Sequence, residues 1–171
     1  MPRYLALLRG VSPTNCSMPE LRECFEAAGF DDVRTLLSSG NVAFTTRGAV
    51  LRTLERKAEE AMLTGMGRAF PTMIRSAEYL QALLADDPFG EFIVPPAAKR
   101  IVTFLRDAEC DAVSLPIERD GARILKCAGT EAFSVYEPTP RGPIFMTLLE
   151  RTFGKDITTR TLATVEKCAQ A

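Results

Sequence analysis

The stretch Val-Arg-Thr-Leu-Leu-Ser-Ser-Gly-Asn-Val-Ala-Phe, residues 33–44, decides the fold of the first half of the chain. Residues of strand-forming type precede the Ser-Ser-Gly-Asn segment and resume after it, which is typical of two β-strands joined by a turn. Gly40 and Asn41 accept a positive φ at little cost, as short hairpin turns require. We therefore predict a β-hairpin whose turn spans 38–41, with Ser39 and Asn41 able to hydrogen-bond its backbone.

The segments around this hairpin predict the rest of one α+β half. We expect a buried strand over 3–9, a helix from a capping box at 17–20 to Gly29, a second helix over about 49–64, and a strand over 70–75. Pro71 restricts the last strand to a sheet edge, because proline cannot donate a ladder hydrogen bond. The order β-α-β-β-α-β is that of the ferredoxin-like, or split βαβ, arrangement, with spatial strand order 4-1-3-2.

This topology brings two loops to one rim of the sheet. The first and second strands run in the same direction, so loop 10–16 and turn 38–41 are expected at the same edge. The candidate ligand-binding residues there are Arg9, Asn15, Ser39 and Asn41, joined by Arg160 if the last helix folds back. Arginine with amide and hydroxyl groups suits a small anionic or nucleotide-like ligand. The alternative is that Arg9 pairs with a carboxylate and the others serve only as turn and cap residues.

The second half carries weaker signals of the same kind. The sequence predicts a helix over 77–85 capped by Ser76, a linker over about 86–98, a strand over 101–105, a helical turn over 108–113, a hairpin at Asp120-Gly121, a strand over 133–136, and helices over 143–154 and from about 161. We expect a ferredoxin-like half over 1–76 and a second α+β half over 77–171, with antiparallel or mixed sheets, packed as one compact unit.

Composition excludes several chemistries. The 171 residues contain no histidine, which removes Ser-His and Cys-His nucleophiles and His-ligated metals, so we expect no catalytic set, metal or cofactor. Five cysteines without a C-x-x-C spacing predict neither a disulfide framework nor a zinc site. The apolar N-terminal run is too short for a signal peptide and no later run is long enough to span a membrane, so a cytoplasmic protein without membrane partners is expected.

Three other roles stay open as alternatives. Cys16 precedes the first predicted helix, where the helix dipole favours a thiolate, so a thiol-dependent enzyme or redox sensor is possible. Lys99 and Arg100, with Tyr4 on the first strand, are thin support for RNA binding, and a net charge of −1 gives no global attraction for nucleic acid. A structural or oligomeric module is the last alternative, and the sequence does not fix the oligomeric state.

Short motifs occur along nearly the whole chain: Leu7-Leu8-Arg9-Gly10, Met18-Pro19-Glu20-Leu21, Gly29-Phe30, Val33-Arg34-Thr35, Ser39-Gly40-Asn41-Val42, Arg75-Ser76, Pro88-Phe89, Lys99-Arg100, Thr103-Phe104-Leu105 and Thr158-Thr159-Arg160. Together they resemble the uncharacterised bacterial family called domain of unknown function 1697. The resemblance implies two ferredoxin-like pieces and no assigned activity. Loop 11–16 departs from the family pattern, which usually has a Gly-Gly-Lys-Asn-like segment there that can present N–H groups to an anion.

Overall fold

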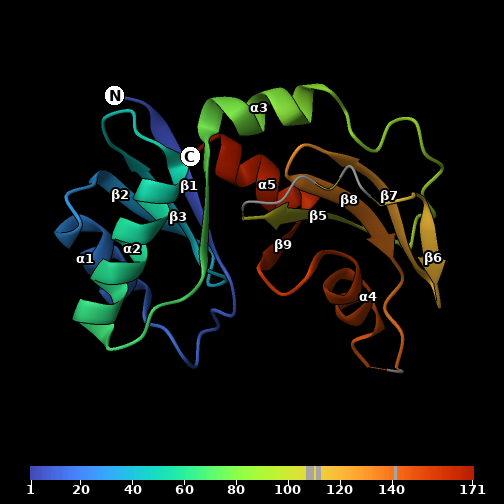
Figure 1. The fold of residues 1–171 in the computed structure, drawn as a ribbon, viewed down its shortest axis with the longest axis horizontal. Helices are drawn as coiled ribbons and strands as arrows, with labels where there is room; N and C mark the ends of the chain where they lie inside the picture. The colour runs from blue at the N-terminus through green and yellow to red at the C-terminus, as the bar shows by residue number, and fades with distance from the viewer. Residues whose placement is uncertain (107–109, 111–112, 141) are drawn as a thin grey trace. The chain divides into compact units, whose positions relative to one another are not determined.

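The chain divides into two units, each with its own antiparallel sheet. The computed structural model describes residues 1–106, 110, 113–140 and 142–171. The first unit comprises Met1–Ala82 together with Glu166–Ala171, and the second comprises Leu83–Val165. Both contain helices and strands (Figure 1). The predicted α+β class with two ferredoxin-like halves is confirmed.

The first unit has the predicted split βαβ topology. Its strands are β1 (Arg3–Leu8), β2 (Asp31–Leu36), β3 (Asn41–Thr45) and β4 (Thr72–Ser76), and its two long helices are α1 (Met18–Ala27) and α2 (Leu51–Met66). The strands lie in the order β2-β3-β1-β4, which is the predicted order read from the other edge. All three pairings are antiparallel. The prediction that the fourth strand is an edge strand is therefore confirmed.

Local signals begin and end the two helices. The Ser17 hydroxyl accepts a hydrogen bond from the backbone N–H of Glu20 at 3.5 Å, as expected of the N-cap in a capping box. Gly29 follows α1 with a φ of +87°. The second helix ends at Gly67, whose φ is +73°, whereas Gly65 lies inside the helix rather than ending it. Without a side chain, Gly65 can approach α1, because a Cβ there would lie 2.7 Å from the Cys24 sulfur.

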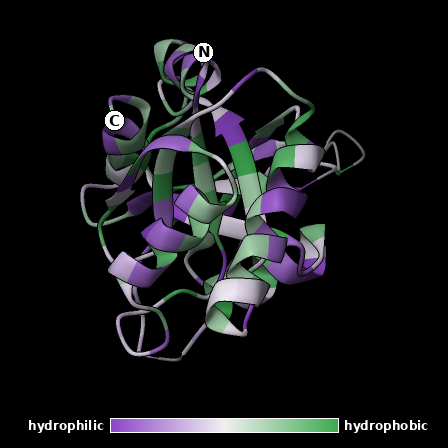
Figure 2. Cartoon of the chain, turned by 90° about the vertical axis from the view of Figure 1, so that its left-hand side faces the viewer, coloured by the Kyte–Doolittle hydropathy of each residue, from purple (hydrophilic) through white to green (hydrophobic). Residues whose placement is uncertain are grey.

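Alternate side chains of β1 are buried on the two faces of the first sheet. Tyr4, Ala6 and Leu8 join the core beneath the helices, in a cluster with apolar residues of α1, α2 and the other strands. Figure 2 looks onto this helical side and shows mostly hydrophobic strands behind the helices. Leu5 and Leu7, on the opposite face, are also fully buried. Both faces of β1 are thus withdrawn from water, which explains why its sequence has little polar alternation.

Side chains cover the outer edge of β4. Glu55 on α2 is 2% exposed, and its Oε1 accepts a hydrogen bond from the backbone N–H of Ile74 at 3.0 Å. The carbonyl of Ile74 accepts a hydrogen bond from Nη1 of Arg75 at 2.9 Å. Exposed strand edges offer unpaired backbone groups to other chains. Glu55 and Arg75 occupy these groups of Ile74 and make it a poor template for an added strand.

The second unit repeats the strand order of the first with one addition. Its elements are β5 (Lys99–Leu105), β6 (Ile117–Arg119), β7 (Ala122–Ala128), β8 (Glu131–Tyr136), α4 (Ile144–Phe153) and β9 (Ile157–Thr161). The strands lie in the order β6-β7-β8-β5-β9. The last four are thus arranged as in the first unit, and β6 extends the sheet by the predicted hairpin at Asp120-Gly121, whose φ values of +48° and +87° suit a tight turn.

Two helices lie where the chain passes between the units. The predicted helix over 77–85 is α3 (Ala77–Ala85), capped by the Ser76 hydroxyl, which accepts a hydrogen bond from the N–H of Tyr79 at 3.1 Å. The last helix is α5 (Leu162–Ala169). The sequence did not predict β9, which pairs with β5 and directly precedes α5. The helical turn predicted over 108–113 lies mostly outside the described residues.

Gly40 is where the hairpin turn meets the segment that follows β1. Its φ is +81°, and a Cβ there would lie 2.9 Å from the Cβ of Val11 and 3.1 Å from the Cβ of Leu8. The other positive φ of the turn belongs to Leu37, at +57°, and not to Asn41, which is buried as the first residue of β3. A side chain at position 40 therefore meets both backbone strain and a packing clash.

We expect Gly40→Ala to lower the free energy of unfolding of the first unit by about 2–5 kcal/mol, adding about 1–2 for the left-handed φ to about 1–3 for overpacking. Gly10→Ala is the matched control, because Gly10 has a φ of +83° but a Cβ there would have no neighbouring atom within 4 Å. Gly10→Ala should lower the free energy of unfolding only by the contribution of the left-handed φ, about 1–2 kcal/mol. Urea unfolding followed by circular dichroism measures both, and equal losses would contradict the packing argument.

We expect Glu55→Ala to destabilise the first unit by about 1–3 kcal/mol, because it leaves a buried N–H of Ile74 without an acceptor. The same variant should associate at concentrations where the parent chain does not, since an edge group of β4 is freed. Glu55→Gln keeps an acceptor oxygen and should lose less stability and associate less. Urea unfolding and light scattering measure the two effects; identical behaviour of the two variants would argue against edge protection.

Candidate functional site

Three connecting segments of the first unit meet at one end of its sheet, beyond the ends of the strands. The backbone N–H of Leu8 donates to the carbonyl of Gly40 at 2.9 Å, which joins the end of β1 to the β2–β3 turn. The N–H of Arg9 donates to the carbonyl of Pro71 at 2.8 Å, which joins it to the segment between α2 and β4. We call this end of the sheet, formed by residues 9–16, 37–40 and 67–71, the rim. The predicted convergence of loop 10–16 with the turn is confirmed.

Two predicted site residues hold the loops of the rim. The Asn15 side chain accepts from the N–H of Ser12 and donates to the carbonyl of Gly10, both at 2.8 Å. The buried Asn41 amide donates to the carbonyl of Leu36 at 3.1 Å and to the Ser39 hydroxyl at 3.0 Å. These contacts are those expected of turn-forming side chains. They shape the rim, and Ser39 is left exposed at its surface.

Two arginines belong to the rim. Arg9 is half-buried and follows β1 directly. Arg68, which the sequence analysis did not select, lies exposed in the segment after α2, with its guanidinium carbon 4.5 Å from the centre of the Phe70 ring. Topology could have identified it, because the connection between the second helix and the fourth strand returns to the same edge as the end of the first strand.

Arg160 belongs to the other unit. It lies on β9, where it is buried and its Nη1 donates to the Thr158 hydroxyl and the Thr159 carbonyl, both at 2.7 Å. Residues 158–160 form a strand of the second sheet. That Arg160 joins the rim stays a prediction. The two hydrogen bonds that Arg160 donates explain why an arginine is tolerated in a buried strand.

The thiol of Cys16 is buried, and its pKa is raised rather than lowered. The main cause is burial, followed by the charges of Cys24 and Glu20, while Arg68 acts in the opposite direction. The expectation that the helix N-terminus favours a thiolate at this position is therefore wrong. A raised pKa leaves less thiolate at neutral pH, and the thiolate is the reactive form. The raised pKa gives no support to thiol chemistry at Cys16.

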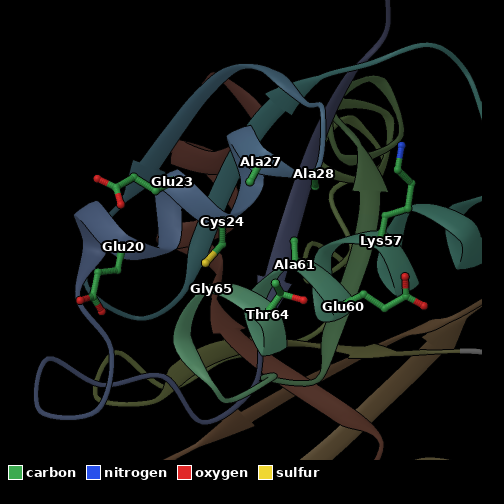
Figure 3. Close-up of a pocket in the computed structure, with 10 residues that line it drawn as sticks. All are labelled: Glu20, Glu23, Cys24, Ala27, Ala28, Lys57, Glu60, Ala61, Thr64 and Gly65. Carbon is green, nitrogen blue, oxygen red and sulfur yellow. The ribbon is translucent and has the colours of Figure 1, made fainter.

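A separate hollow lies between the two helices of the first unit. It has a volume of about 560 Å³ and is lined by residues of α1, its C-cap and α2, namely Glu20, Glu23, Cys24, Ala27, Ala28, Lys57, Glu60, Ala61, Thr64 and Gly65 (Figure 3). We call it the helix groove. Small side chains form its floor, and the Cys24 sulfur is directed toward Gly65. The sequence analysis missed this groove, because small residues at helix spacing look like ordinary packing positions.

The described part of the chain offers neither a metal-ion cluster nor a membrane-spanning helix. No group of three or more cysteine, aspartate or glutamate residues there is arranged to hold a metal ion. None of the helices described has the length and apolar character needed to cross a bilayer.

Comparisons with known proteins agree with the motifs and the fold. A family model described as "Protein of unknown function (DUF1697)" matches residues 1–133. The solved structure of the conserved bacterial protein SP0830 from Streptococcus pneumoniae is similar, with a TM-score of 0.71 and 19% sequence identity over 99% of this chain and 97% of that one. An identity this low speaks for the fold alone. No curated protein matches. Because the family model spans more than half of the sequence, the chain belongs to the DUF1697 family of proteins of unknown function.

Proposed function

We propose that the protein binds a small anionic or nucleotide-like ligand at the rim of its first unit. The observation that carries the proposal is the meeting of three connecting segments at one sheet edge, two of which supply the arginines Arg9 and Arg68. Guanidinium groups match the geometry of phosphate and carboxylate oxygens and stay charged at any physiological pH. Hydroxyls of Ser12, Thr14 and Ser39 belong to the same segments and are suited to the remaining ligand oxygens.

Charged groups near the rim favour anion binding more than the net charge of the whole chain does. The total net charge is −1, so attraction must come from nearby groups and not from a global field. The N-terminus of α1 adjoins the rim and adds a partial positive charge. Glu20 in the first turn of this helix opposes it, and it contributes to the raised pKa of Cys16. We therefore expect compact anions to bind at the arginine-bearing segments of the rim, away from Glu20.

Asn15 and Asn41 enter this proposal as shaping residues. Their side-chain amides are hydrogen-bonded to the loop and turn backbones, so their replacement should alter affinity through the loop conformation. Arg160, which belongs to the second unit, is not required by the proposal.

The test is a thermal-shift panel of inorganic phosphate, pyrophosphate, nucleoside mono- and triphosphates and small carboxylates. A ligand at about 100 times its Kd adds about 2.7 kcal/mol of stability, which corresponds to a rise in Tm of about 5–10 °C for a chain of this size. Arg68→Ala should remove most of the rise. Loss of its contact with Phe70 should itself cost no more than about 1 kcal/mol at this exposed position.

Arg47→Ala is the matched control, because Arg47 is an exposed arginine in the segment after β3, at the opposite end of that strand from the rim. It should leave the ligand-induced rise unchanged. If no anion in the panel raises Tm, the binding proposal fails. If the two variants lose the rise equally, the ligand binds by general charge attraction and the rim is not its site.

A further inference from the structure

The helix groove combines an apolar floor with acidic walls. Its floor is made by Cys24, Ala28, Ala61 and the backbone at Gly65, whose missing side chain lets the two helices approach. Larger residues at these positions would fill the space between the helices. The groove therefore exists because the facing residues are small, and a bound side chain could contact apolar atoms there without moving either helix.

Three exposed carboxylates stand on its walls. Glu20 and Glu23 come from α1 and Glu60 from α2, and Figure 3 shows their carboxylates at the outer margins of the groove. No ion pair joins any of the three to another residue in the described part of the chain. The positive group of the lining is Lys57, whose Nζ lies 5.4 Å from the centre of the Phe30 ring. The lining thus carries a net charge of −2, from three carboxylates and one ammonium.

An exposed leucine lies beside the groove on α2. Leu63 is 58% exposed, and it lines a second hollow of about 280 Å³ together with Arg52, Arg56, Glu59, Glu60 and Ala69. At about 100° per residue, Leu63 lies on a different face of α2 from the floor residues Ala61 and Gly65. The two hollows share Glu60 and are otherwise separate.

We propose that the helix groove is the docking site for a basic amphipathic segment of a partner protein. Apolar side chains of that segment would lie on the alanine and cysteine floor. Its lysines or arginines would pair with Glu20, Glu23 and Glu60. This is recognition of a peptide by a groove between helices, with charge complementarity setting the choice of partner. The inference does not depend on anion binding at the rim.

The openness of the groove favours an extended occupant over a small molecule. Most of the lining is exposed, including the three glutamates, Lys57 and Thr64. A pocket for a small ligand usually buries most of the ligand's surface, and a groove walled by two helices alone does not. A peptide gains instead from many contacts along its length.

The experiment measures binding of a short, dye-labelled peptide of alternating lysine and leucine, by fluorescence anisotropy. The matched peptide has glutamate in place of lysine. We expect saturable binding of the basic peptide alone, weakening as salt is raised. Glu20→Gln, Glu23→Gln and Glu60→Gln combined should weaken it about tenfold, from three exposed ion pairs. Ala61→Phe, which fills the floor without changing charge, should also weaken it.

The control combines Glu78→Gln, Glu118→Gln and Glu166→Gln, which make the same change in net charge at exposed positions outside the groove. It should leave the affinity nearly unchanged. Equal weakening by the two triple variants would overturn the proposal in favour of general charge attraction. An unchanged affinity in Ala61→Phe would also overturn it, as would binding of spermine without binding of the peptide. If the parent chain self-associates and Ala61→Phe abolishes this, the occupant of the groove is a second copy of the chain and the proposal is likewise overturned. Circular dichroism confirms that each variant is folded.

Discussion

The contact of Gly40 with the chain after β1 is the constraint on which the first unit depends. The turn at this position needs a left-handed φ, and the nearby Val11 and Leu8 leave no room for a side chain. The hydrogen bond from Leu8 to Gly40 continues the pairing of β1 with β3 at the same place. Since a slip of one residue would exchange the two faces of a strand, this contact also helps to keep Tyr4 and Phe44 under the helices.

The elements that the sequence predicted are those with strong local signals. The Ser17 cap, the Asp120-Gly121 turn and the Gly154 stop act through their immediate neighbours, and the structure has all three. Strand β9 was missed because its Thr-Thr-Arg sequence lacks apolar alternation; its pairing with β5 stabilises it, and that partner is distant in sequence. Topology predicted that the loops of the rim meet. The prediction that Asn41 can hydrogen-bond the turn backbone is confirmed by its contact with the carbonyl of Leu36, whereas the exact partners of Asn15 depend on the loop path.

A small net charge conceals a separation of charge within the first unit. Arginines occupy the connecting segments at the rim, whereas exposed glutamates line the margins of the groove between α1 and α2. The pKa of the Cys16 thiol, at the end of the rim next to α1, is influenced by Glu20 and Arg68 in opposite directions. Since screening limits such effects to about 10 Å at ordinary ionic strength, the field of each region reaches only nearby groups. The first unit therefore presents two surfaces that differ in charge.

The first unit is discontinuous in sequence, since its final part is residues 166–171. This segment is held by side chains from earlier parts of the same unit: Arg3 donates to the carbonyl of Ala171 at 3.2 Å and Gln81 to that of Ala169 at 2.9 Å. During translation, these acceptors leave the ribosome only after the whole second unit has been made. Domains usually fold in the order of their synthesis. Here the unit that starts first cannot be completed first, so a nascent chain must hold an unfinished first unit while the second is still being produced.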